Sequence, residues 1–108
     1  MGQLSYAGES QTFEVDDEVL SHLRLVAVTK LRRGESFPLT LRVSDSRTET
    51  LWMHASIPVR FTIDADVELQ RPVLVKMMAA ASGAGGLDLT DIDFTPLSSS
   101  ARVMHAVA

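Results

Sequence analysis

The chain has 108 residues, of which 45% are hydrophobic, and its formal net charge is −4. This size and apolar content suit one domain with a single core. The acidic balance argues against strong non-specific binding to nucleic acid, and the absence of cysteine excludes disulfides, thiolate catalysis and cysteine-ligated metal sites.

Residues 1–34 predict a β-hairpin followed by a helix. Two short strand-like runs, 3–7 and 11–15, flank Gly8, which can supply the turn. From residue 16 onward the apolar residues recur at helical spacing. Asp16 or Asp17 can cap this helix at its start, and Gly34 can end it.

Residues 36–63 predict three neighbouring antiparallel strands. Apolar and polar residues alternate over 36–43 and again over 57–63, and residues 50–56 form a further strand-like run after a polar turn. Pro38 lacks an N–H group, so we expect it on an edge strand or at a strand start.

The C-terminal part predicts a second helix and a last strand. Residues 71–82 are good helix formers with Pro72 in the first turn and Gly83 as the C-cap, and alternation returns over 86–92. We therefore expect a single α+β domain over residues 1–94 and a mobile tail over 95–108. Its fold is predicted to be a two-layer sandwich, with two helices on one face of a mainly antiparallel sheet of about six strands in the order ββαβββαβ.

Three cations, Lys30, Arg32 and Arg33, fall in the last turn of the first predicted helix. They complement the partial negative charge of a helix C-terminus, and this is the interpretation that we favour. The alternative is that these three side chains form an anion-binding site. Because the backbone presents carbonyls at this end of a helix, only the side chains would hold the anion.

A second candidate surface arises on the predicted sheet. If Leu51 and Met53 join the core, Trp52 and His54 lie on the opposite face, near arginines of the neighbouring strands. An aromatic platform among arginines can stack and neutralise a single strand of nucleic acid. Two alternatives stay open: a register shift of one residue that buries Trp52, or a second copy of the chain that covers this face. The candidate nucleic-acid-binding residues are Lys30, Arg32, Arg33, Arg42, Trp52, His54 and Arg60.

No pattern of reactive residues points to catalysis or to a bound cofactor. The histidines at 22, 54 and 105 form no close ligand pair, and the acidic stretch at 88–93 lacks the glycine and the closing glutamate of a calcium loop. No serine sits in a nucleophile elbow. We predict no catalytic residue, no metal site and no cofactor.

Four segments carry a resemblance to a known family: "FEVDDEVLSHL", "TKLRRGESFPL", "LWMHASIPVRF" and "RPVLVKMMAAASGAGGLDL". In their order along the chain and in their amino-acid sequence, they resemble a family of short actinobacterial proteins of unknown function, whose members are often labelled "ATP-dependent DNA ligase". The resemblance covers residues 1–92 and implies a connection to DNA metabolism. Such ligases use a lysine in a Lys-x-Asp-Gly motif, and neither Lys30 nor Lys76 stands in one.

These observations favour a non-enzymatic interaction module that associates with itself or with a protein partner through its sheet face. The alternative is an accessory protein that binds single-stranded nucleic acid. The sequence contains no run of about 18 apolar residues and no apolar leader behind positive charges. We therefore expect a cytoplasmic protein without membrane contact.

Overall fold

The computed structural model describes residues 1–8, 11–65 and 67–91, so the tail expected at 95–108 lies outside the described residues. Its elements follow the order ββαβββαβ, which confirms the predicted α+β class and element order. The helices are α1 (Asp17–Arg32) and α2 (Arg71–Ser82), and the strands are β1 (Gly2–Tyr6), β2 (Thr12–Val15), β3 (Phe37–Ser44), β4 (Arg47–Met53), β5 (Val59–Thr62) and β6 (Leu87–Asp88).

The six strands form two three-stranded sheets instead of one continuous sheet. In the first sheet β1 lies between β2 and β5, and in the second β3 lies between β4 and β6. Every pair is antiparallel except β3 with β6, which is parallel. The expectation that residues 57–63 lie beside the second strand of the 36–56 hairpin is therefore wrong, because β5 pairs with β1.

Matching apolar faces explain why β5 pairs with β1. Val59 lies opposite Tyr6, and Phe61 lies opposite Leu4, so the inward side chains of both strands meet one core. The chain leaves β4 through a turn in which the N–H of Ile57 donates to the carbonyl of His54 at 3.1 Å. This turn carries the chain to the other sheet rather than back along β4.

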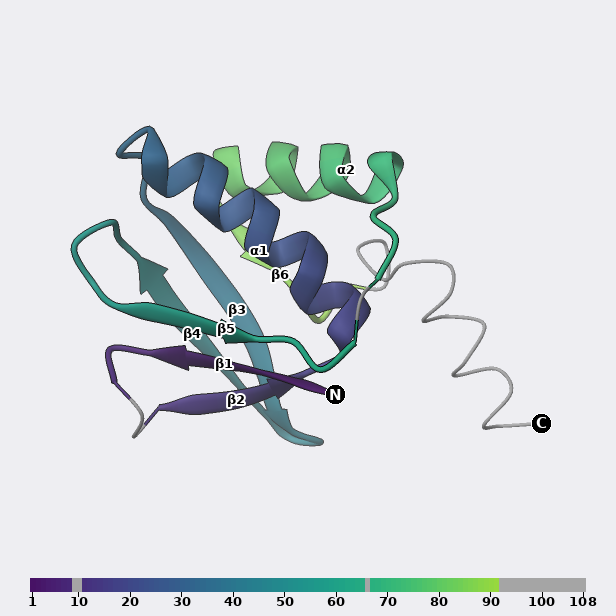
Figure 1. The fold of residues 1–108 in the computed structure, drawn as a ribbon. Coiled ribbons are helices and arrows are strands. Elements are labelled where there is room, and N and C mark those ends of the chain that lie inside the picture. Colours follow the sequence, from purple (N-terminus) through teal and green to yellow (C-terminus); the bar gives the residue numbers. More distant parts are fainter. Residues whose placement is uncertain (9–10, 66, 92–108) are drawn as a thin grey trace.

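Both helices lie on the same side of the strands (Figure 1), as predicted. Helix α1 packs against β1 and α2, and α2 also packs against β3 and β6. The core between helices and strands contains side chains from every sheet and both helices; those with no exposed surface include Leu4, Leu20, Leu23, Phe37, Leu39, Met53, Met77 and Leu87.

The ends of α1 follow the signals in the sequence. The carboxylate of Asp16 accepts the N–H of Glu18 at 2.9 Å and so caps the first turn. At the other end, Gly34 adopts a φ of 71°. The N–H of Glu35 donates to the carbonyl of Lys30 at 3.0 Å, which satisfies one of the free carbonyls of the last turn.

Helix α2 begins beside Pro72 in its first turn and ends at the C-cap Gly83, as predicted. The chain then reaches β6 through Gly86, whose φ is 72°. Pro38 is the second residue of β3, and the pairing with β6 begins one residue later, at Leu39. Pro38 therefore occupies a strand start, where its missing N–H removes no bond to β6.

Candidate functional site

Lys30 is a structural residue at the junction of the two helices. Its side chain is buried, and its ammonium contacts the carboxylate of Glu35 at 2.9 Å and donates to the hydroxyl of Ser82 at 3.0 Å. This hydrogen bond from Lys30 lowers the pKa of Glu35. The ammonium thus ties the end of α1 to the end of α2 and is already engaged within the domain.

Arg32 and Arg33 are exposed at the C-terminal end of α1, beside Thr29. Their positions complement the helix dipole, as the favoured interpretation requires. Within the described part of the chain, neither guanidinium forms an ion pair. The two side chains therefore leave a positive end of α1 open to solvent.

Trp52 lies on the solvent side of the second sheet. Leu51 and Met53 are buried, whereas 58% of Trp52 is exposed, so the register leaves the indole outside the core. Along β3 and β4 the pairs that share this face are Pro38 with Trp52, Thr40 with Thr50 and Arg42 with Thr48. We call these six residues the Trp52 face.

Arg42 shares the Trp52 face but does not touch the indole. Arg42 lies four positions further along β3 than Pro38, the partner of Trp52, which corresponds to roughly 13 Å along the strand. Its guanidinium donates to the carbonyl of Asp45 at 3.4 Å in the turn that follows. The arginine and the tryptophan thus occupy opposite ends of one strand face.

The other two candidates lie elsewhere. His54 follows β4 in an exposed turn, where its Nδ1 accepts the N–H of Ser56 at 3.1 Å and contacts the Ser56 hydroxyl at 2.7 Å. Arg60 lies on β5, in the other sheet, opposite Ser5. The structure therefore brings Arg42 and Trp52 onto one face and Lys30, Arg32 and Arg33 to one helix end, but it does not place Arg60 in the sheet that carries Trp52.

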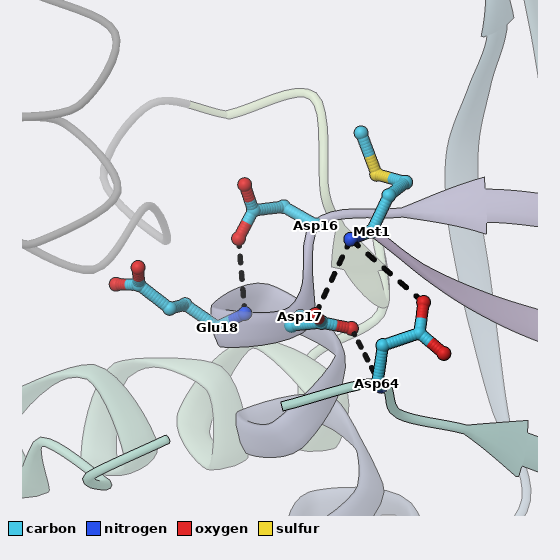
Figure 2. Close-up of polar contacts among 5 residues, drawn as sticks. All are labelled: Met1, Asp16, Asp17, Glu18 and Asp64. Carbon is cyan, nitrogen blue, oxygen red and sulfur yellow. Dashed lines mark hydrogen bonds and ion pairs between the residues drawn. The ribbon is translucent and has the colours of Figure 1, made fainter. Parts of the chain in front are cut away.

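A polar cluster near the start of β1 was not predicted from the sequence. The amino group of Met1 lies 3.3 Å from the buried carboxylate of Asp17 and 3.9 Å from that of Asp64, as Figure 2 shows. The second oxygen of Asp17 accepts the N–H of Asp64 at 3.2 Å. Asp17 therefore joins the residue before β1, helix α1 and the segment after β5. No local sequence motif predicts this long-range role.

His22 plays a similar linking role in the core. The ring is fully buried on α1, with Nδ1 2.5 Å from the carbonyl of Glu18 and Nε2 accepting the N–H of Gln70 at 2.8 Å. This pair of bonds requires the neutral ring with its proton on Nδ1. Burial lowers the pKa of His22, which favours the same neutral form.

An apolar groove runs between α1 and the segment that enters β5. Its walls are Ala27, Val28, Leu31 and Arg32 on the helix and Ala55, Ile57, Val59 and Phe61 on the other side. The sequence offered one signal for it: Leu25 and Val28 are apolar yet lie off the helical stripe that faces the core, and each is 43% exposed. Only Val28 of the two lines the groove.

The described residues contain neither a candidate metal centre nor a membrane-spanning helix. Within residues 1–8, 11–65 and 67–91, no three His, Cys, Asp or Glu side chains gather closely enough to hold a metal ion. In the same ranges, neither helix has the length and apolar character needed to cross a membrane.

The fold and surfaces define a small α+β domain of two sheets and two helices, with an exposed tryptophan face and an apolar groove. The chain belongs to the family described as a domain of unknown function (DUF7882), whose profile matches residues 1–92. No curated protein and no solved structure shows a significant match to the chain.

Proposed function

We propose that this domain is a non-enzymatic interaction module that associates with itself, or with a protein partner, through the Trp52 face. The observation that supports it is the exposure of 58% of a tryptophan at the end of a regular strand. A side chain of this size leaves a large apolar area in water, and association would remove that area. Tryptophan and arginine, which both occur on this face, are also enriched at the energetic centres of protein interfaces.

The backbone beneath the indole is held in place from the other sheet. The hydroxyl of Tyr6 on β1 donates to the carbonyl of Trp52. Burial raises the pKa of Tyr6, so the hydroxyl keeps the proton that it donates. Because this bond already holds the backbone at Trp52, association would mainly order the indole. The entropic cost of association would therefore be low.

The shape and composition of the Trp52 face suit the packing of two copies. Two of its threonines, Thr40 and Thr50, form a hydrogen bond with each other across the strands at 2.9 Å, so these hydroxyls have a partner within the face. Two such faces related by a twofold axis would pack sheet on sheet, with each indole against the partner's strand surface. Arg42, at the far end of the face, would then lie toward the polar rim.

Replacing Trp52 with serine should weaken self-association at least tenfold, since a tryptophan that is a hot spot of an interface contributes about 2 kcal/mol or more. Light scattering coupled to size-exclusion chromatography over a concentration series measures it. Val75→Ser is the matched control, because Val75 is a 59% exposed apolar residue on α2, outside the Trp52 face. Wild-type protein that stays monomeric throughout, or equal effects of both substitutions, would contradict self-association through this face.

Binding of single-stranded nucleic acid is the second candidate function, and the connection to DNA metabolism implied by the family resemblance belongs to it. The observation in its favour is that Trp52 and Arg42 share one solvent-facing strand surface. In fluorescence anisotropy with a labelled oligothymidylate, affinity should fall as salt rises and should be lost in Trp52→Ala and Arg42→Ala. No binding at low salt, or binding that salt does not change, would exclude this function.

The proposal also includes a cytoplasmic location and a domain boundary near residue 94, which stay predictions.

A further inference from the structure

The outer edge of β5 presents backbone groups that the described chain does not pair. In β1, the N–H of Tyr6 donates toward β2, to Gln11, and the N–H of Ala7 donates toward β5, to Pro58. Because bonding directions alternate along an antiparallel ladder, residues 58, 60 and 62 face β1. The N–H and C=O groups of Val59 and Phe61 therefore point away from the sheet, and the described residues supply no partner to them.

The apolar groove adjoins this same strand. Ile57, Val59 and Phe61 line one wall, and their spacing of two residues means that alternate side chains of the segment turn toward α1. Val28 and Leu31 form much of the opposite wall. A strand laid along β5 would pair with the backbone of Val59 and Phe61 and place every second side chain into the groove.

Charge at the end of the groove indicates what that strand should carry. Arg32 lines the groove and, with Arg33, also lines the neighbouring hollow at the end of α1. Neither arginine forms an ion pair with another described residue. A carboxylate on the incoming strand would pair with this guanidinium, which suits bidentate recognition of carboxylates.

We propose that the β5 edge and the adjoining groove bind an extended peptide segment of a partner protein, with apolar side chains at alternate positions and an acidic residue at the end that reaches Arg32. Addition of a strand to a free sheet edge is a recurring mode of peptide recognition, in which main-chain bonds provide affinity and the alternate pockets provide specificity. This site is separate from the Trp52 face, so the inference goes beyond the function proposed above.

The length of β5 favours one short segment over an extended sheet. The strand has four residues, and Pro58 ends its regular pairing on one side. A second copy of the chain, paired through its own β5, is the less suitable occupant, because that strand has the sequence VRFT and contains no carboxylate to pair with Arg32.

Fluorescence anisotropy with labelled, end-blocked nonapeptides tests this proposal. The probe alternates valine with threonine and carries glutamate at both ends, so that either strand direction brings a carboxylate to Arg32. Val28→Glu should weaken its binding at least tenfold, whereas Leu25→Glu, equally exposed on the same helix but outside the groove, should not. Val59→Pro should also weaken binding, because it removes an outward N–H and leaves the ladder to β1 intact.

A charge exchange tests the role of Arg32. Arg32→Glu should reject the glutamate peptide and bind the same peptide with lysine at both ends. Trp52→Ser should bind the glutamate peptide as the wild type does, so that failure of the Trp52 face and failure of the groove are distinguishable.

Three results would overturn the proposal. The first is no binding of the alternating peptide, or equal binding of a scrambled peptide of the same composition. The second is an equal response to Val28→Glu and Leu25→Glu. The third is self-association without peptide that Val28→Glu abolishes, which would assign the groove to a second copy.

Discussion

Gly86→Ala is expected to destabilise the domain by about 2–5 kcal/mol, combining the strain of a left-handed backbone with an overpacked contact. Gly86 has a φ of 72°, and a Cβ atom built on it would lie 2.3 Å from Cγ and 2.4 Å from the carbonyl oxygen of Pro38. Neither the proline ring nor the strand backbone can move away easily. The substitution should therefore push β6 away from β3. Urea unfolding monitored by circular dichroism measures the loss.

Gly34→Ala separates the two causes. Its φ of 71° matches that of Gly86, but no atom lies within 4 Å of the position where its Cβ would stand. Only the backbone strain of about 1–2 kcal/mol should remain, partly offset by the lower entropy of the unfolded chain. If the two substitutions cost the same, close packing of Gly86 against Pro38 does not contribute to stability.

His22→Leu should also destabilise the domain, by about 2–3 kcal/mol, although leucine is apolar and similar in size. The substitution removes the acceptor of the Gln70 N–H and the donor to the Glu18 carbonyl. Each lost hydrogen bond lowers the net stability by about 0.5–1.5 kcal/mol. Because Gln70 is the N-cap of α2, the start of that helix should lose protection from hydrogen exchange first.

The same histidine should make stability depend on pH. Burial lowers the pKa of His22 in the folded state below its ordinary value of 6.5, so between the two values the unfolded chain binds a proton that the folded chain does not. Stability is therefore complete above about pH 6.5 and falls as the pH decreases below it. Urea midpoints from pH 7.5 to 5 should show this slope in the wild type and in His54→Gln, which alters an exposed histidine, but not in His22→Leu. A slope that survives in His22→Leu would assign the effect to another group.

If both proposed surfaces bind as we expect, the domain would act as an adaptor. The Trp52 face belongs to the sheet of β3, β4 and β6, whereas the groove lies between α1 and the edge of the other sheet. A dimer formed through the first surface would present two grooves. A partner with two such peptide segments would then bind the dimer more tightly than a partner with one segment. The increase in affinity depends on the spacing of the two segments and needs no additional contact in either groove.

Local signals in the sequence were sufficient to predict the elements. The Asp16 cap, the glycine after α1 and Pro72 at the start of α2 act within a few residues, and the structure uses each of them as expected. The alternation around Trp52 predicted strands in the same way. The alternation did not decide whether Trp52 faces the core or the solvent, because a shift of one residue in the register moves every side chain of a strand to the opposite face.

The amino-acid sequence by itself determined the α+β class, the order of the elements and the ends of the two helices, since periodicity and capping depend on near neighbours along the chain. Only the tertiary structure decided that the strands form two sheets, that β5 joins β1, that Trp52 faces solvent and that Lys30 is engaged with Glu35 and Ser82. These outcomes depend on which distant side chains pack together. Strand pairing and burial lower the free energy through contacts between segments that no local pattern specifies.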